Sequence, residues 1–308
     1  MTNYAGYMGK VIRLDLGSRS VSEYPWTDRD RRLYLGGKAM ASKIMYDTFT
    51  GSEKPLEPEN IIVISTGPLT GTGAPSSSRF NISTLSPQTG ITTSSNCGGN
   101  FGHYLKKAGY DALIISGKCE KLTWVEIHND IIKFHDAQEL KGLCTTPTQE
   151  SIQQKLDEER GCEVKCGKVV IGPAGENLVK YASVFSNERA AGRAGVGCVF
   201  GSKNLKGIAV SGTHEVSIYD PQKTHKLFEK WVETLKKHPL TGNQLPKMGT
   251  AGLVTTMQMR GLLSTRNYAK GQFEDFELVN GETLAEDINI VNKGCHSCPM
   301  KCARTVKV

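Results

Sequence analysis

The chain has 308 residues, of which 38% are hydrophobic and 22% are charged, and it carries a net charge of +7 at pH 7. This length can bury a sizeable core and predicts two domains. No apolar run approaches the ~20 residues that span a membrane, and the basic residues are scattered, so neither a membrane nor a nucleic acid is expected as a partner.

The first predicted strand covers residues 9–15, where apolar and polar residues alternate. Between residues 146 and about 160, Thr146-Pro147-Thr148-Gln149 predicts a helix that opens with a capping box and has proline at its first position. Four further strands are short and apolar, and each ends in glycine. They are Ile61–Gly67, Ala112–Gly117, Lys168–Gly172 and Gly207–Gly212.

These strands form two matching sets that are about 100 residues apart. Strand-glycine units are common, so a chance match is the alternative, but several dipeptides recur in the same order. Gly67-Pro68, Ser95-Asn96, Leu105-Lys106 and Ser116-Gly117 are followed by Gly172-Pro173, Ser186-Asn187, Leu205-Lys206 and Ser211-Gly212. The repeat predicts an internally duplicated β-rich domain over residues 1–213.

Two segments combine glycine with polar side chains, one within residues 76–100 and its counterpart within residues 186–197. Neither matches a Walker A loop or a dinucleotide-binding fingerprint. Each contains an arginine and an asparagine, and arginine together with bare glycine backbone suits an anionic ligand. Turn chemistry at the ends of sheets is the alternative; the presence of two matched copies favours ligand binding.

After residue 213 the pattern becomes helical. Lys223–Lys237 is predicted to be an amphipathic helix, and Ala251–Met259 a second helix. Residues 214–308 are therefore expected to begin a helical domain, which gives the fold class α+β. The apolar face of the first helix carries Leu227, Phe228, Trp231 and Leu235.

Three cysteines close to residue 308 have the spacing C-x2-C-x3-C: Cys295, Cys298 and Cys302. Three thiolates in a short loop suit an iron–sulfur cluster, whereas structural zinc needs C-x2-4-C pairs with two further ligands. The spacing favours the cluster over zinc. A [4Fe–4S] cluster needs a fourth ligand, so either that ligand comes from far upstream or the chain stops before the protein is complete. Without a secretion signal, the nine cysteines predict reduced thiols in an oxygen-poor cytoplasm.

Taken in order, these motifs resemble the aldehyde:ferredoxin oxidoreductase family, which contains tungsten enzymes with a bis-pterin cofactor. The resemblance covers essentially the whole chain but only about the first half of a family member. The matching motifs are Gly9–Leu16, Gly67–Pro75, Arg79–Asn81, Asn96–Gly99, Ala108–Ala112, Gly172–Asn177, Arg189–Gly197, Gly201–Lys206, Gly249–Ala251 and the Cys295 motif.

The resemblance implies a domain of two packed sheets with helices, on which the paired pterins (bis-molybdopterin with tungsten, or molybdenum) rest. It implies that Cys295, Cys298 and Cys302 are three of the four ligands of a [4Fe–4S] cluster. It also implies that six residues contact the pterins: Arg79, Asn96, Gly98, Arg189, Ala190 and Gly192.

The function implied by the resemblance is oxidation of a small aldehyde to a carboxylic acid, with electrons leaving through the cluster to ferredoxin or a ferredoxin-like subunit. A homodimer or hetero-oligomer is compatible with this function. The catalytic residues and the fourth cysteine are expected beyond residue 308, so the chain alone is not expected to be active. Two alternatives stay open: a related oxidoreductase with another substrate, such as an aromatic-ring thioester, and a non-catalytic iron–sulfur or zinc protein that serves electron transfer or as a scaffold.

Overall fold

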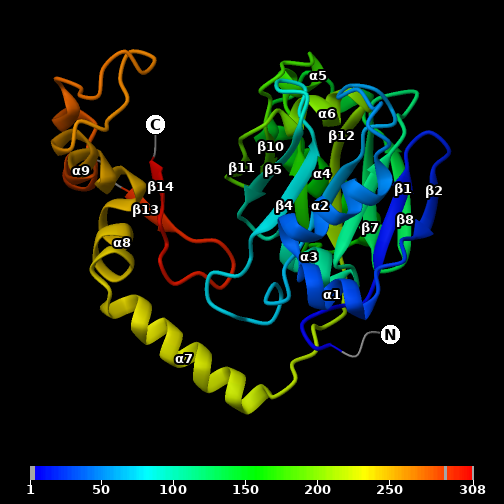
Figure 1. Ribbon diagram of the computed structural model, residues 1–308, viewed down its shortest axis with the longest axis horizontal. Helices are drawn as coiled ribbons and strands as arrows, with labels where there is room; N and C mark the ends of the chain where they lie inside the picture. Colours follow the sequence, from blue (N-terminus) through cyan, green and yellow to red (C-terminus); the bar gives the residue numbers. More distant parts are fainter. Residues whose placement is uncertain (1–3, 288–289, 307–308) are drawn as a thin grey trace. The chain divides into compact units, whose positions relative to one another are not determined.

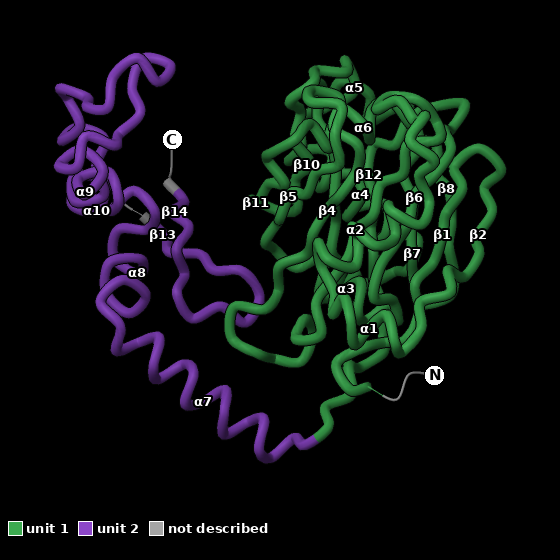
Figure 2. The backbone as a smooth tube through the Cα atoms, viewed as in Figure 1, with its two compact units in different colours: residues 1–219 green, residues 220–308 purple. Residues whose placement is uncertain are grey.

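The computed structural model describes residues 4–287 and 290–306, and the chain forms two compact units, residues 1–219 and 220–308 (Figure 2). Unit 1 contains two six-stranded mixed sheets with helices, and unit 2 contains the long helix α7 (Pro221–Lys237), several short helices and one two-stranded hairpin. The α+β fold class predicted from the sequence is therefore confirmed. Among the described helices, none combines the length and the apolar character that crossing a membrane requires.

The first sheet of unit 1 has the strand order β2-β1-β6-β3-β4-β5, and β1 and β6 are parallel. Helices α1 and α2 connect β2 to β3, and α3 connects β5 to β6. The bounds are β1 Val11–Asp15, β2 Ser20–Glu23, α1 Asp28–Tyr34, α2 Gly37–Thr48, β3 Ile62–Ser65, β4 Phe80–Leu85, β5 Thr92–Cys97, α3 Phe101–Lys107 and β6 Ala112–Ser116.

The second sheet repeats this arrangement. Its order is β11-β10-β9-β12-β7-β8, which read backwards matches the first sheet strand for strand, and β7 and β12 are again the parallel pair. The bounds are β7 Thr123–His128, β8 Ile131–Asp136, the 3-10 helix η1 Gln138–Leu140, α4 Thr145–Arg160, β9 Gly167–Val170, α5 Pro173–Glu176, β10 Val184–Ser186, β11 Arg189–Ala191, α6 Val196–Ser202 and β12 Leu205–Ser211.

The predicted duplication is confirmed, although only part of the dipeptide pattern that indicated it is structurally equivalent. The Gly-Pro pairs follow β3 and β9, and the Ser-Gly pairs end β6 and β12. By contrast, Ser95-Asn96 lies on β5, whereas Ser186-Asn187 ends β10 and enters the next turn. Lys106 lies in helix α3 but Lys206 lies on strand β12. Glycine after a strand therefore marks the repeat more reliably than the polar pairs do.

The two sheets pack face to face around one core. Residues such as Leu14 and Ile64 from the first sheet share a buried cluster with Val125 and Ile208 from the second. The outer face of the first sheet is covered by α2 through Met40 and Ile44, and the outer face of the second by α4 through Ile152 and Leu156. Both faces of the central strands are thus buried, which explains why they appear in the sequence as continuous apolar runs instead of alternating patterns.

A buried lysine joins the two halves of unit 1. The Nζ of Lys203, in the second half, donates hydrogen bonds to the carbonyl oxygens of Pro58 and Gly117 in the first half, at 3.0 Å each. The residue is fully buried, and this burial lowers the pKa of its ammonium group to about 8. Two carbonyl partners satisfy a cation that would otherwise be costly to remove from water.

Helices α5 and α6 pack so closely that glycine is needed at their contact. A Cβ on Gly201 would lie 1.9 Å from the carbonyl oxygen of Gly175. Because backbone must move to relieve this overlap, Gly201→Ala is expected to lower the melting temperature by about 6–12 °C, equivalent to about 3 kcal/mol. In the matched control, Gly17→Ala, the added methyl would meet its nearest atom at 3.4 Å, and little change is expected. Equal melting temperatures in circular-dichroism scans of both variants would contradict the close contact.

The predicted capping box at Thr146 is wrong. Helix α4 begins at Thr145 with Cys144 as its N-cap, and no side chain caps it. The hydroxyl of Thr148 instead donates to the carbonyl oxygen of Cys144 at 2.8 Å. Gln149, expected to bond the backbone N–H of the N-cap residue, instead donates to the carbonyl oxygen of Thr145 at 3.2 Å and bonds the backbone of Asn187.

Unit 2 contains both predicted helices with small changes at their starts. Helix α7 begins at Pro221 because the Asp220 side chain accepts a hydrogen bond from the backbone N–H of Lys223 and caps it. The second predicted helix begins with a 3-10 turn before α9. The bounds are α7 Pro221–Lys237, the π-helix η2 Pro239–Gln244, α8 Leu245–Met248, the 3-10 helix η3 Gly249–Gly252, α9 Leu253–Met259, the 3-10 helix η4 Phe276–Leu278, α10 Gly281–Asp287, β13 Ile290–Lys293 and β14 Ala303–Val306.

Candidate cofactor site and cysteine loop

Strands β5 and β11 lie side by side (Figure 1). The six residues expected to contact pterin lie on these strands or next to their ends. Each of these strands is the outermost of its sheet. Phe80 pairs with Cys97, so Arg79 and Gly98 flank the same end of the β4–β5 hairpin. The other four residues are Asn96 on β5, Arg189 and Ala190 on β11, and Gly192 directly after β11. We call the region formed by these six residues the cofactor edge.

Most of the cofactor edge is open to solvent. The side chains of Arg79, Asn96 and Ala190 are exposed, as is Gly192, whereas Arg189 is half-buried and Gly98 is buried. A large ligand could therefore contact the first four directly. Gly98 lies beneath the surface, where it can shape the backbone.

The two halves of the duplicated domain meet at this edge. Gly99 has a φ of +91°, and a Cβ there would lie 3.0 Å from the Oγ of Ser186. The backbone N–H of Arg193 donates to the Oγ of Ser95 at 3.2 Å. The conformation and the close approach both require glycine at position 99. The contacts hold the turns of the two halves next to each other.

Several buried polar atoms around the cofactor edge lack hydrogen-bond partners within the described residues. They are the Oγ of Ser78, the Oδ1 of Asn81 and the Oγ of Ser186. An unpaired buried group costs about 1–3 kcal/mol. Such groups are rare in native proteins and need a reason, which is often functional. The two serine hydroxyls can donate and the Oδ1 of Asn81 can accept. Together with two arginines and an exposed asparagine, these groups fit an anionic ligand that forms many hydrogen bonds.

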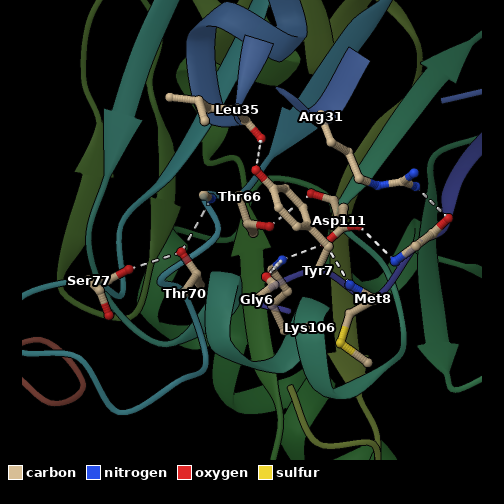
Figure 3. Close-up of polar contacts among 12 residues, drawn as sticks. Gly6, Tyr7, Met8, Arg31, Leu35, Thr66, Thr70, Ser77, Lys106 and Asp111 are labelled. Carbon is tan, nitrogen blue, oxygen red and sulfur yellow. Dashed lines mark hydrogen bonds and ion pairs between the residues drawn. The ribbon is translucent and has the colours of Figure 1, made fainter. Parts of the chain in front are cut away.

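A buried ion pair organises the segments that lead to Arg79 (Figure 3). The carboxylate of Asp111 accepts hydrogen bonds from the backbone N–H groups of Met8 and Gly9, at 3.0 and 2.9 Å, and forms an ion pair with Lys106. Thr66, at the end of β3, donates its backbone N–H and its hydroxyl to the carbonyl oxygen of Asp111. Asp111 belongs to the Ala108–Ala112 motif, but its role as the anchor of these segments was not predicted from the sequence. A charged residue directly before a buried strand is the sequence feature that indicates such a role.

The loop between β3 and Arg79 is closed by Thr70, as Figure 3 also shows. The hydroxyl of Thr70 accepts from the backbone N–H of Gly67 at 3.3 Å and donates to the carbonyl oxygen of Ser77 at 3.0 Å. Thr70 is buried. The hydroxyl thus ties the first glycine of the Gly67–Pro75 motif to the residues just before Arg79.

The three cysteines share the loop that joins β13 and β14 in unit 2. The backbone N–H of Cys298 donates to the carbonyl oxygen of Cys295 at 3.0 Å, and all three cysteines are half-buried. Gly249 packs against this loop: it has a φ of +63°, and a Cβ there would lie 2.8 Å from the carbonyl oxygen of Cys302. The loop is therefore compact, and its thiols are neither deeply buried nor fully exposed, which suits cluster ligands.

One other group of side chains has the spacing of a metal site. Ligand atoms of Glu126, His135 and Glu159 converge within 4.8 Å, the only such group among the described residues. However, Arg160 lies 2.6 Å from Glu126, and Lys133 pairs with Glu159. Hydrogen bonds from His135 and Arg160 lower the pKa of Glu126 to about 2. The carboxylates already have cationic partners, so the group is an ion-pair network.

Comparison with known proteins agrees with the fold and the candidate site described above. The model of the aldehyde ferredoxin oxidoreductase N-terminal domain matches residues 11–212, and the model of domains 2 and 3 of the same enzyme matches residues 226–308. The chain belongs to the aldehyde ferredoxin oxidoreductase family. The family resemblance inferred from the sequence motifs is thereby confirmed.

Relatives in this family are similar along nearly the whole chain. The tungsten-containing aldehyde ferredoxin oxidoreductase of Thermococcus kodakarensis is 39% identical over 304 residues, which are 98% of this chain and 49% of that protein. The enzyme of the same name from Pyrococcus furiosus is also 39% identical, over 97% of this chain and 49% of its own length. The chain thus spans about half the length of the curated relatives it matches.

Two more distant members show how far the fold extends. A WOR-like subunit of an aliphatic sulfonate oxidoreductase from Pyrococcus furiosus is 30% identical over 240 residues, 74% of this chain and 38% of that protein. The active-site complex BamBC of benzoyl coenzyme A reductase, solved with 1,5-dienoyl-CoA, has a TM-score of 0.84 and 30% identity. The match covers 99% of this chain and 48% of that one.

Proposed function

We propose that this chain provides the pterin-binding base and three cluster ligands of a tungsten oxidoreductase that oxidises aldehydes to carboxylic acids. The observation that carries the proposal is the contact between β5 and β11, the edge strands on or beside which the residues of the cofactor edge lie. The tungsten-containing relatives support a tungstopterin cofactor, with molybdenum as the alternative metal.

Each residue of the cofactor edge has a proposed part in holding the pterins. Arg79 and Arg189 would offer planar forks to anionic groups, and Asn96 would offer an amide that both donates and accepts. At Gly98, Ala190 and Gly192, small or absent side chains would let the cofactor approach the backbone. The Gly99–Ser186 contact would hold the pterin-binding residues of the first half in a fixed position relative to those of the second half.

We propose that Cys295, Cys298 and Cys302 are ligands of a [4Fe–4S] cluster. When bound, the tungsten–pterin group and the cluster supply the redox chemistry, in which an aldehyde and water give a carboxylic acid, two protons and two electrons. Electrons would pass to ferredoxin or a ferredoxin-like subunit. The two distant relatives are named as a subunit and a complex, which supports an oligomer for this protein as well. The cysteine usage supports a reducing cytoplasm.

A second candidate is a related oxidoreductase that acts on another substrate. It is favoured by the TM-score of 0.84 to the benzoyl coenzyme A reductase complex over nearly the whole chain. The same pterin base and cysteine loop would serve either reaction. An assay with small aldehydes and aromatic thioesters in parallel would separate these two substrate classes.

The experiment that tests the proposal is metal and pterin analysis of protein isolated without oxygen from its source organism. We expect about four iron atoms, one tungsten or molybdenum and two pterins per chain. Iron without pterin would instead indicate an electron-transfer or scaffold protein. Zinc alone would show that the cysteines form a structural site.

A further inference from the structure

A glutamine from α4 holds the turn between β10 and β11. The Oε1 of Gln149 accepts a hydrogen bond from the backbone N–H of Asn187 at 2.7 Å, and its Nε2 donates to the carbonyl oxygen of the same residue at 3.2 Å. Gln149 is only 8% exposed. One planar amide thus bonds both backbone polar groups of one turn residue, which fixes the position and orientation of that residue.

This turn needs an external anchor. Strand β11 has three residues, and its pairing within the sheet is with β10 alone. Ser186 pairs with Arg189, which leaves Asn187 and Glu188 as a two-residue turn, with Asn187 at a φ of +53°. A short hairpin of this kind is marginally stable by itself. Backbone groups within its turn have no ladder partner across the hairpin, and Gln149 provides one.

A second anchor holds the other end of the same segment. There, the backbone N–H of Arg193 donates to the Oγ of Ser95 on β5. Residues 187–193 are therefore fixed at their start by α4 and at their end by β5. All three second-half residues of the cofactor edge, Arg189, Ala190 and Gly192, lie between these two anchors.

We propose that Gln149 is a positioning residue for pterin binding, acting through the Asn187 turn to place Arg189 and Ala190. The inference rests on the proposed function. Gln149 does not itself reach the cofactor edge; its effect passes through the backbone of Asn187, two residues before Arg189. Its side chain must supply both a donor and an acceptor. Glutamate would keep the acceptor, lose the donor and place a carboxylate oxygen opposite the carbonyl oxygen of Asn187.

The test compares Gln149→Ala with Gln153→Ala in protein isolated without oxygen from the source organism. Gln153 lies one turn further along α4, is half-buried, and its amide donates to the carbonyl oxygen of Val164 at 2.9 Å, but no hydrogen bond joins it to Asn187. Two measurements are made on each variant: the ratio of pterin to iron, and hydrogen exchange of the peptide covering residues 187–193.

In Gln149→Ala we expect about tenfold faster exchange in residues 187–193, because both hydrogen bonds to the backbone of Asn187 are lost. We also expect a pterin-to-iron ratio at least about threefold below wild type, since the arginine is no longer held in place. Gln149→Glu, which keeps one of the two contacts, is expected to fall between. Gln153→Ala should lower the melting temperature while leaving exchange in residues 187–193 and the pterin ratio at wild-type values.

Two results would overturn the inference while leaving the proposed function in place. One is a wild-type pterin ratio in Gln149→Ala, and the other is an equal loss of pterin in Gln149→Ala and Gln153→Ala, which would mean that only the stability of α4 matters. Wild-type protein that contains iron but no pterin would overturn the proposed function, and this inference with it.

Discussion

Replacing Cys298 with serine is expected to abolish the iron–sulfur absorbance of the protein and to remove nearly all of its iron. Cys298 lies in the middle of the cysteine loop, and its backbone N–H is bonded to the carbonyl oxygen of Cys295. Iron–sulfur clusters are held by thiolates, and a serine hydroxyl at the same position stays protonated near neutral pH. Visible absorbance and iron analysis of anaerobic protein measure the effect.

The control for this variant is Cys162→Ser. Cys162 is an exposed free cysteine in unit 1, far along the chain from the cysteine loop. Its replacement removes one thiol without touching a proposed ligand, so iron and absorbance should stay at wild-type levels. Full retention of iron in Cys298→Ser would show that this thiol is not a ligand. Loss in both variants would point to a general dependence on free thiols instead of ligation.

The duplication was predictable because glycine marks strand ends for a local reason. Gly67 and Gly172 follow β3 and β9, while Gly117 and Gly212 follow β6 and β12. The chain turns at equivalent places in both halves, so glycine recurs at matching positions in the sequence. Buried central strands also reveal themselves as apolar runs, since both of their faces are covered.

The hairpin strands at the sheet edges were not predictable in the same way. Strand β5 has the sequence Thr-Thr-Ser-Ser-Asn-Cys, and β11 has only three residues. Neither shows an apolar run or a clear apolar–polar alternation, because β5 consists of small polar residues and one cysteine and β11 is too short for a period to be visible. Yet these are the strands that form the cofactor edge. The residues of these strands could be identified through motifs. That β5 and β11 lie side by side depends on how the two sheets pack, which the motifs do not reveal.

Gln149 shows the limit of local patterns most clearly. In Thr146-Pro147-Thr148-Gln149 the residue types match a capping box, but the helix begins two residues earlier than predicted. The glutamine donates to the carbonyl oxygen of Thr145 and also bonds a residue 38 positions away. A capping box and a long-range clamp use the same donor and acceptor chemistry. Only the tertiary structure decides which partner the side chain reaches.

Replacing Arg189 with alanine is expected to lower the pterin content by roughly tenfold or more while leaving the iron content unchanged. A hydrogen bond to a charged group is worth about 1.5–3 kcal/mol, and more where water is excluded. Arg189 is half-buried, whereas Arg79 is exposed, so Arg79→Ala is expected to have the smaller effect. Pterin and iron are measured on the same sample, which separates loss of the cofactor from loss of folded protein.

An exposed arginine away from the cofactor edge is the control for charge alone. Arg32 lies on α1 and is exposed, so Arg32→Ala removes one positive charge without altering β5 or β11. Its pterin content should match wild type. Wild-type pterin in both Arg79→Ala and Arg189→Ala would mean that the cofactor edge does not bind pterin. In that case the Gly99–Ser186 and Arg193–Ser95 contacts would serve only to join the two halves of the domain.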